Sequence, residues 1–396
     1  MLLAHTLLLI GNLAVLVPVG VFSAEVAASL APPRKRGAVA QGRPNVAVIV
    51  PAHDEAADIG DTVSALRTQL RSGDRLVVVA DNCSDDTARL GEQAGAEVIV
   101  RTDPDRRGKG FALDFGVRHL AAAPPEVVII VDADCRLSAG AVDHLAAAAS
   151  QGRPAQALYL MSAPDNADIR LRVAELAFLV KNQVRPAGLQ RLGFGCQLTG
   201  SGMAFPWPII RDANLAHGSL VEDMRLGVDL ALAGTPARFC PEARIDSHFP
   251  QTSTGIASQR SRWEEGHLGM MAMALKLLPR ARRNPGALAL VLDIMVPPLT
   301  LLLLLAAAAL AVTAILTVAL ALPGPAFWLA VANSLLLGAA SFAAWYAFGR
   351  TVLPARSILG VLPYMLGKVG FYRAFAGGKR SAGWIRTDRK RGGDGS

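Results

Sequence analysis

Residues 127–134 constrain the fold more than any other stretch, because an apolar, β-branched run ends there in two carboxylates. The run from Val127 to Val131 is followed directly by Asp132 and Asp134, with one alanine between them. Such a run is typical of a strand buried on both faces of a parallel sheet. In open α/β sheets, ligands bind beyond the carboxyl ends of the strands. The pattern therefore predicts that both aspartates lie at the binding edge of a sheet.

The spacing of the two aspartates suits a divalent cation. Carboxylates this close repel each other unless a cation lies between them. Mg²⁺ prefers one or two protein carboxylates together with substrate phosphates, and Mn²⁺ takes the same kind of oxygen ligands. We therefore expect Asp132 and Asp134 to hold Mg²⁺ or Mn²⁺ beside a nucleotide diphosphate. A solvated Asp-x-Asp turn is the simpler interpretation of the pair alone, so the hypothesis depends on the surrounding motifs.

Strand and helix patterns alternate on both sides of this run. Further strands are predicted at 46–50, 75–81, 96–101 and 156–161. Helical spacing of apolar residues and capping signals predict helices at roughly 55–71, 84–95, 111–122, 139–150 and 167–185. This order predicts an α/β domain with a doubly wound, mainly parallel sheet.

Polar residues follow the predicted strands. Pro51, Asp54 and Glu55 come at the end of the first strand, and Asp81 ends the second. Lys109 lies between two glycines, which let the backbone approach a phosphate while the lysine supplies a point charge. The spacing is not that of a Walker A loop. An ordinary turn with a solvated lysine is an equal alternative.

Two motifs in the second half offer polar groups to a substrate. Gly200 and Ser201 belong to a glycine-rich loop whose backbone can approach a ligand, with plain turn chemistry as the alternative. Glu222 and Asp223 begin a predicted helix, and Asp223 is a candidate general base. Acidic residues in a first turn commonly do no more than stabilise the helix dipole. For this pair alone, that is the simpler interpretation.

Gln259, Arg262 and Trp263 share one face of a predicted helix that runs to about residue 278, because they are three and four positions apart. Arginine forms bidentate bonds with phosphate, and an aromatic face packs against a sugar ring. The three side chains therefore suit a diphosphate and a sugar. The alternative is an amphipathic helix that uses Trp263 as an anchor at the membrane interface. The two interpretations are compatible.

Apolar segments at both ends of the chain predict membrane anchoring of a soluble middle. Residues 2–24, 299–322 and 326–348 are each long enough to cross a bilayer. Nothing basic precedes the first segment, and Arg34, Lys35 and Arg36 follow it. This favours a signal anchor over a cleaved signal peptide, and it places the middle domain in the cytoplasm.

Two regions near the predicted spans are ambiguous. Asp293 precedes Pro297 and Pro298 in an apolar stretch, which predicts a broken or interfacial helix, because an unpaired carboxylate in lipid is costly. Residues 352–375 mix apolar and basic side chains. They predict an amphipathic helix on the membrane surface, with a fourth span as the alternative.

Charge and cysteine usage exclude some function classes. The net charge of +8 is concentrated beside the apolar segments and in the tail. This fits attraction to anionic lipid, and the lack of a basic patch with interleaved aromatics argues against nucleic acid as a partner. The cysteines are widely spaced, so reduced thiols are expected rather than disulfides or zinc ligands. They are Cys83, Cys135, Cys196 and Cys240.

In this order, the motifs resemble those of membrane-bound glycosyltransferases of family 2, the group that includes cellulose, chitin and hyaluronan synthases. The resemblance covers roughly residues 46–265, and its most specific element is the Gln-x-x-Arg-Trp motif at 259–263. The tail from Trp384 to Thr387 is also similar to bacterial exopolysaccharide members. Three positions depart from the family pattern and leave donor identity and processivity open: Asp54, Asn82 and Val221.

The resemblance implies a GT-A-type fold and an inverting, metal-dependent hexosyltransferase. The expected donor is a UDP-sugar, and the expected acceptor is a growing polysaccharide or glycan. Asp223, next to Glu222, would deprotonate the acceptor hydroxyl, and Asp132 and Asp134 would position the metal and the diphosphate. The implied donor-binding residues are Pro51, Asp54, Glu55, Asp81, Lys109 and Asp132. The implied contacts to acceptor and diphosphate are Gly200, Ser201, Gln259, Arg262 and Trp263.

The expected location is the bacterial inner membrane, with several passes and a cytoplasmic catalytic domain. Three spans are few for a channel, so an oligomer or an export partner is an open alternative. The expected parts are a transmembrane anchor (1–30), a linker (31–45), the GT-A domain (46–265), interfacial or broken helices (266–298), a transmembrane hairpin (299–349) and an amphipathic helix with a basic tail (350–396).

Two other functions are alternatives to polysaccharide synthesis. The first is transfer of a single sugar to a lipid acceptor, as in relatives similar to ceramide glucosyltransferase. The second is a non-catalytic membrane scaffold that keeps a degenerate sugar-nucleotide fold. The intact Asp132, Asp134, Asp223 and Arg262 argue against the scaffold.

Overall fold

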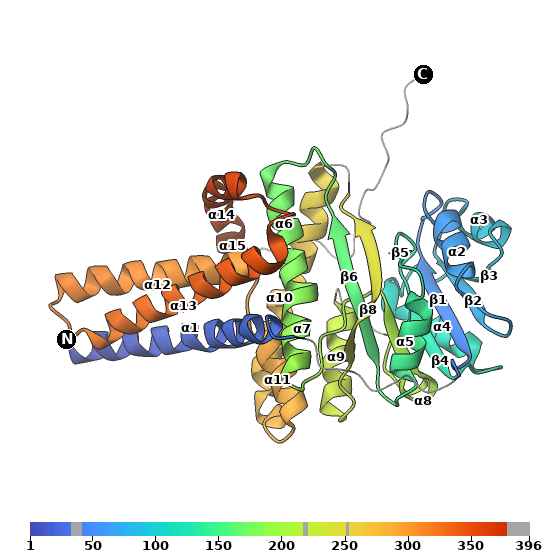
Figure 1. The fold of residues 1–396 in the computed structure, drawn as a ribbon, viewed down its shortest axis with the longest axis horizontal. Coiled ribbons are helices and arrows are strands. Elements are labelled where there is room, and N and C mark those ends of the chain that lie inside the picture. The colour runs from blue at the N-terminus through green and yellow to red at the C-terminus, as the bar shows by residue number, and fades with distance from the viewer. Residues whose placement is uncertain (33–41, 217–220, 251–252, 378–396) are drawn as a thin grey trace.

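The computed structural model describes residues 1–32, 42–216, 221–250 and 253–377. Within these residues an eight-stranded sheet lies at one end of the molecule, and three long apolar helices project from the other end (Figure 1). The prediction of an α/β domain with flanking apolar helices is therefore confirmed. The strands are β1 (Val46–Ala52), β2 (Arg75–Asp81), β3 (Glu97–Arg101), β4 (Val127–Ile130), β5 (Arg136–Leu137), β6 (Ala155–Ser162), β7 (Met203–Pro206) and β8 (Arg238–His248).

The sheet has a parallel part and a mixed part. Its strand order is β3-β2-β1-β4-β7-β6-β8-β5. β1 pairs in parallel with β2 and with β4, and β2 pairs in parallel with β3, as the sequence pattern predicts. β7 then lies antiparallel between β4 and β6, so the sheet is mixed. The pairing of Ile130 with Met203 brings the loop at Gly200 to the carboxyl end of β4.

The sheet is buried on both faces, which explains the unbroken apolar strands. Residues Val46 to Val50 of β1 all have side chains with no exposed surface. Val48 faces the core layer that includes Ile59, and Ile49 faces the layer that includes Leu113. Full burial of such a side chain contributes roughly 1.5–3 kcal/mol. Strands of this kind therefore hold their carboxyl ends at fixed positions.

The helices of the α/β domain and of the segment that follows it keep the predicted order, with bounds that differ from the predicted ones by a few residues. They are α2 (Ile59–Arg67), α3 (Thr87–Gln93), α4 (Lys109–Leu120), α5 (Ala141–Ala149), α6 (Ile169–Leu179), α7 (Arg185–Arg191), α8 (Trp207–Arg211), α9 (Glu222–Leu232), α10 (Ser253–Ala281) and α11 (Pro285–Ile294).

One predicted helix has a different course from the expected one. The sequence predicts a single helix at 167–185, whereas the structure continues from α6 through a π-helical turn (Val180–Val184) into α7. A π turn inserts one extra residue into the helical repeat and is frequent at functional sites. The turn changes which side chains face the domain core from residue 180 onward.

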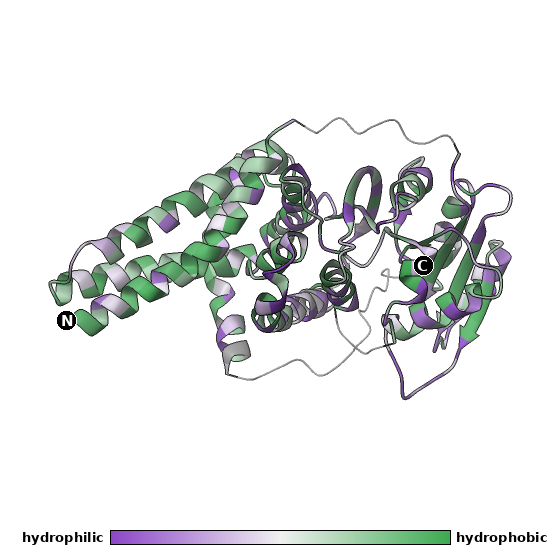
Figure 2. Cartoon of the chain, turned by 90° about the horizontal axis from the view of Figure 1, so that it is seen from below, coloured by the Kyte–Doolittle hydropathy of each residue, from purple (hydrophilic) through white to green (hydrophobic). Residues whose placement is uncertain are grey.

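In the described part of the chain, three helices are long and apolar enough to cross a bilayer: α1 (Leu2–Ser29), α12 (Leu299–Ala319) and α13 (Pro325–Ala344), which continues as a π turn (Trp345–Gly349). Most of their residues are hydrophobic (Figure 2). Asn12 of α1 donates a hydrogen bond to Thr313 Oγ1 of α12 over 3.0 Å, and Asn333 of α13 donates to the Asn12 carbonyl over 2.9 Å. These two hydrogen bonds therefore join α1 to both of the other helices.

The segment after α13 consists of short helices. A 3₁₀ helix (Ala355–Gly360) is followed by α14 (Val361–Gly367) and α15 (Val369–Ala376). Each is too short to cross a bilayer. Lys368 between them forms an ion pair with Glu264 of α10 at 2.5 Å. Two stretches used in the sequence analysis lie outside the described residues: the basic residues at 34–36 and the tail at 384–387.

A buried ion network joins α1 to the α/β domain. Arg185 Nε donates to Glu25 Oε2 over 2.8 Å, and Arg185 Nη2 donates to Asp293 Oδ1 over 2.5 Å. All three residues are at most 7% exposed. The sequence gives no partner for Asp293. In the structure it lies in the last turn of α11, before the two prolines, and pairs with Arg185 of α7. The network ties α1, the domain and the segment before α12 together.

Candidate active site

A cavity of about 330 Å³ lies between the α/β domain and the apolar helices α1 and α12. Eight of the predicted site residues line it: Lys109, Asp132, Gly200, Glu222, Asp223, Gln259, Arg262 and Trp263. They come from the carboxyl end of β4, the loop before β7 and the helices α4, α9 and α10. Sequence positions that are far apart therefore meet at one place.

The paired aspartates follow β4 directly, and two serines fix them. The backbone N–H of Asp132 donates to Ser201 Oγ over 3.1 Å, and Ser247 Oγ donates to Asp134 Oδ2 over 2.8 Å. One side-chain ligand atom each from Asp132, Asp134 and Cys135 lies within 4.8 Å of the others. Burial and the two carboxylates hold the pKa of the Cys135 thiol well above its usual range. The carboxylates are therefore the fitting ligands for a hard divalent cation.

Lys109 begins α4 next to the aspartates. Gly108 precedes it with a φ of 127°, a conformation that a side chain would strain. Lys109 Nζ forms an ion pair with Asp132 and donates a hydrogen bond to the Gly200 carbonyl over 2.8 Å. Burial alone would lower the pKa of Lys109, but the carboxylates of Asp132 and Glu222 outweigh it and raise the pKa. The ammonium is therefore charged at neutral pH.

Glu222 and Asp223 form the first turn of α9 and face Lys109 across Gly200. A Cβ at Gly200, whose φ is +89°, would lie 3.4 Å from Asp223 Oδ2 and 3.5 Å from Lys109 Nζ. Burial, with the charge of Asp223, raises the pKa of Glu222 to about 7. Burial also raises the pKa of Asp223, against the opposing effects of Lys181 and Lys109. A raised carboxyl pKa in a cavity is typical of a proton-transfer site.

The three residues of α10 line one wall, as their spacing predicts. The Gln259 side chain is 2% exposed, and its Oε1 has no hydrogen-bond partner among the described residues. The Trp263 ring packs against Phe178 with 5.6 Å between ring centroids. Arg262 lies on the same wall between them. The wall thus offers an amide, a guanidinium and an aromatic surface to a ligand.

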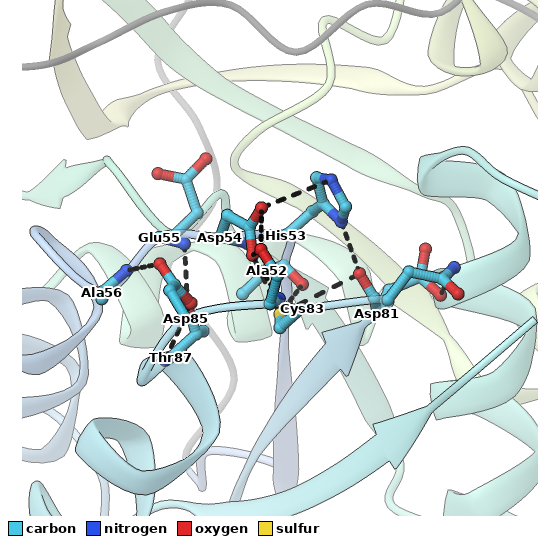
Figure 3. A network of polar contacts seen from close by, with 11 residues as sticks. Ala52, His53, Asp54, Glu55, Ala56, Asp81, Cys83, Asp85 and Thr87 are labelled. Atoms are coloured by element: carbon cyan, nitrogen blue, oxygen red, sulfur yellow. Dashed lines mark hydrogen bonds and ion pairs between the residues drawn. The ribbon is translucent and has the colours of Figure 1, made fainter. Parts of the chain in front are cut away.

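The motifs after β1 and β2 lie together but not on the cavity wall (Figure 3). Asp54, with a φ of 55°, accepts a hydrogen bond from the Ser84 N–H over 2.6 Å, and the Glu55 N–H donates to Thr87 Oγ1 over 2.8 Å. Pro51 is part of β1. These contacts connect the loops after the first two strands at the binding edge of the sheet.

Asp81 is 6% exposed and pairs with Arg101, whose Nη1 donates to Asp81 Oδ1 over 2.6 Å. His53 Nδ1 donates to the Asp81 carbonyl over 2.7 Å (Figure 3). The carboxylate thus has a protein partner that the sequence did not suggest. Asp81 lies at the same edge as the aspartate pair, but it does not line the cavity that contains Asp223.

Ser201 occupies a different position from the expected one. Its side chain is fully buried. The hydroxyl oxygen accepts a hydrogen bond from the Asp132 N–H, and the hydroxyl donates one to Cys135 Sγ over 3.2 Å. The hydroxyl points into the protein because β7 starts two residues later and is paired with β4. Ser201 therefore positions Asp132 instead of facing an acceptor, whereas its neighbour Gly200 lines the cavity.

Among the lining residues that the sequence analysis did not select are two polar residues of the π turn. Lys181 and Asn182 belong to the π turn and line the cavity beside Asp223. In a regular helix at 167–185, charged residues are normally a solvated face. The only sequence signal is a lysine and an amide between the apolar Val180 and Val184.

The sheet order and the helices of this chain are those of the GT-A class of glycosyltransferases, with a paired-aspartate edge and an acidic cavity beside it. Residues 44–266 match the family model described as "Glycosyltransferase like family 2". The chain therefore belongs to glycosyltransferase family 2.

Curated relatives match over part of their length. An uncharacterized glycosyltransferase of Mycobacterium tuberculosis is 35% identical over 107 residues, which are 27% of this chain and 44% of the relative. The probable glycosyltransferase YdaM of Bacillus subtilis is 27% identical over 235 residues, covering 57% of this chain and 55% of that protein. The chain thus spans about half the length of the curated relatives it matches.

A solved structure has the same fold. The mannosyltransferase PcManGT from Pyrobaculum calidifontis, in complex with GDP-Man and Mn²⁺, aligns with a TM-score of 0.53 and 20% identity. The alignment covers 85% of this chain and 97% of that one. It extends well beyond the segment matched by the family model.

Proposed function

We propose that this chain is an inverting, metal-dependent hexosyltransferase that moves a sugar from a nucleotide-diphosphate donor to an acceptor at the cytoplasmic face of a bacterial inner membrane. One observation carries the proposal: Asp223 lies across Gly200 from Lys109, which is itself paired with Asp132. A carboxylate base and a diphosphate-binding edge therefore face the same cavity. The sequence resemblance favours a UDP-sugar, while the PcManGT structure holds GDP-Man.

The donor would be held at the edge formed by the strand ends. Asp132 and Asp134 would bind Mg²⁺ or Mn²⁺, and their carboxylate-only donor set fits such an ion. When bound, the cation neutralises charge on the diphosphate. Lys109 adds a second positive charge beside Asp132. Asp81, held by Arg101, and the loop at Asp54 would contact the nucleoside at the other end of the same edge.

Asp223 would act as the base. The acceptor hydroxyl oxygen attacks the anomeric carbon, the bond from that carbon to the diphosphate oxygen breaks, and the hydroxyl proton moves to Asp223. Attack opposite to the leaving group inverts the anomeric configuration. The Arg262 guanidinium would stabilise charge on the departing nucleotide diphosphate. Trp263, fixed by Phe178, would form the floor for the acceptor sugar.

The acceptor class follows from the resemblance and from the cavity wall. The family resemblance to cellulose, chitin and hyaluronan synthases favours a growing polysaccharide or glycan. One structural observation favours the second candidate, single transfer to a lipid: Phe22 of α1 and Leu299 of α12 line the same cavity as Asp223. Both helices are long and apolar enough to cross a bilayer. An acceptor with an apolar chain would reach the site along them.

The test is a panel of radiolabelled UDP- and GDP-sugars offered to membranes that contain the full chain, with and without Mg²⁺ or Mn²⁺. We expect turnover of at least one donor, and only with the cation. Asp223→Asn should lower the turnover number by about 10²–10⁴-fold, with nucleotide binding unchanged. Asp229→Asn, on the exposed side of the same helix, is the control.

Product size separates the two acceptor classes. A ladder of lengths supports polysaccharide synthesis, and a single glycolipid species supports transfer to lipid. Absence of turnover with every donor, together with wild-type behaviour of Asp223→Asn in the host, would reject the enzyme and favour a scaffold.

A further inference from the structure

The π turn places an unpaired ammonium in the cavity. Lys181 is partly buried and lines the cavity, and no hydrogen bond or ion pair joins its Nζ to any residue that the structure describes. Burial lowers the pKa of Lys181, and the Asp223 carboxylate opposes that effect. A charged group removed from water needs a counter-charge. Lys109 and Arg185 of the same cavity have such partners in Asp132, Glu25 and Asp293.

Two further polar atoms at this end of the cavity have no protein partner. Asn182 is 3% exposed, and its Oδ1 accepts no hydrogen bond among the described residues. Thr199 Oγ1 is also buried without a partner there. Both residues line the cavity with Lys181. A buried polar atom without a hydrogen-bond partner is costly, so these two atoms beside the Lys181 ammonium indicate a ligand site.

The cavity also has apolar lining residues, and these belong to the candidate membrane-spanning helices or lie next to them. Phe22 of α1, Val296 before α12 and Leu299 of α12 line the cavity, and α1 and α12 are two of the three candidate spans. A molecule whose head group reaches Lys181 would have its apolar part against these residues. Asp223 lines the same cavity.

We infer that Lys181, Asn182 and Thr199 form an acceptor subsite for an anionic lipid whose head group carries both a phosphate and a free hydroxyl. The phosphate would pair with Lys181, since lysine binds phosphate as a point charge. The hydroxyl would face Asp223, and the acyl chains would lie along Phe22 and Leu299. This inference rests on the proposed function, because it uses Asp223 as the base. The hydroxyl oxygen bonds to the anomeric carbon, the donor's bond to the diphosphate breaks, and the proton moves to Asp223.

Binding is tested without relying on turnover. The full chain is purified in mixed micelles that contain phosphatidylglycerol, phosphatidylmethanol, which lacks the hydroxyl, or diacylglycerol, which lacks the phosphate. Retained lipid is measured by mass spectrometry. We expect both phospholipids to be retained about tenfold more than diacylglycerol, because a charge-assisted contact contributes this much. With a sugar donor and Mn²⁺ added, only phosphatidylglycerol should gain a sugar.

Matched variants assign the effect to the subsite. Lys181→Met should remove the preference for the phospholipids, and Lys181→Arg should restore it. Thr199→Val, a smaller change, should lower retention by a few fold. Lys276→Met is the control, because Lys276 is an exposed lysine of α10. Nucleotide binding measured by calorimetry should be the same in all of these proteins, which shows that they are folded.

Three outcomes overturn the inference. They are equal retention of diacylglycerol, unchanged retention in Lys181→Met, and competition by free glycerol 3-phosphate as strong as that by the whole lipid. The last result would assign the site to a soluble phosphate. If lipid retention depends on Lys181 but no sugar donor is turned over, the proposed function fails and the subsite stands. If glycans are elongated while Lys181→Met retains lipid normally, the subsite fails and the proposed function stands.

Discussion

The α-carbon of Gly188 lies against the backbone carbonyl of Glu25, so closely that a Cβ at position 188 would be 2.0 Å from that oxygen. This contact joins α7 of the α/β domain to α1, next to the ion pair between Arg185 and Glu25. The atoms that the added Cβ would meet belong to the backbone of Glu25, so no flexible side chain can move to make room for it.

Gly188→Ala should therefore separate α1 from the domain. We expect a loss of about 1–3 kcal/mol in the free energy of unfolding, as for other overpacked sites. Denaturant unfolding of the full chain in detergent measures it. Gly20→Ala, on α1 and with no atom within 4 Å of the added Cβ, is the control. A wild-type midpoint for Gly188→Ala would contradict the close packing.

Arg185→Met should destabilise the chain by about 3–5 kcal/mol, because it leaves Glu25 and Asp293 buried without a counter-charge. Arg170→Met, an exposed arginine of α6, should be neutral. A triple variant that also carries Glu25→Gln and Asp293→Asn should recover part of the loss, since the stranded charges are gone. Equal destabilisation of the single and triple variants would show that packing, not charge, decides the effect.

Ser247→Ala should weaken metal activation. Ser247 Oγ holds Asp134 Oδ2 at 2.8 Å, and loss of such a supporting contact typically costs about 10–100-fold in metal affinity or activity. A titration of activity with Mn²⁺ measures the change, and a chelator should abolish activity in both proteins. Ser150→Ala, an exposed serine after α5, is the control. An unchanged Mn²⁺ titration would place the metal elsewhere.

Glu222→Gln should change the pH dependence of stability. In the folded chain, burial and the charge of Asp223 raise the pKa of Glu222 from 4.5 to about 7. Between these values the folded state keeps a proton that the unfolded chain has lost, so stability from this group falls as pH rises through the window. Glutamine does not titrate, so the variant does not lose this stability as pH rises.

We therefore expect Glu222→Gln to gain stability over the wild type as pH rises, by about 1–3 kcal/mol at pH 8 relative to pH 4. Thermal unfolding of both proteins across this range gives the difference, in which the other titrating groups largely cancel. A difference that stays constant with pH would mean that Glu222 is not a protonated buried acid.

Local pattern was sufficient for the first half of the sheet. β1, β2 and β4 begin at the predicted residues, because each is a β-branched run buried on both faces with a carboxylate or turn after it. The positions of Asp132 and Asp223 on one cavity also follow from the order of the motifs. Sequence spacing on α10 correctly places Gln259, Arg262 and Trp263 on one wall.

The rest depends on contacts between distant segments. Lys181 and Arg185 look like the polar face of a helix until a π turn and the docking of α1 and α11 bury them. The partner of Asp81 is Arg101 from the neighbouring strand β3. The order of strands in the sheet brings these two residues together, and spacing in the sequence does not predict that order. Ser201 resembles a loop hydroxyl, but the antiparallel entry of β7 turns it inward.

Residues of α1 and of the beginning of α12 line the cavity together with the acidic groups of the α/β domain. During synthesis, the α/β domain would leave the ribosome well before the hairpin is made, and it would then have every reacting side chain but no complete enclosure. If the proposed function holds, the domain alone should therefore turn over sugar nucleotide poorly until α12 is in place. By the same logic, a protease that clips the N-terminal helix would inactivate the enzyme while every catalytic side chain remained intact.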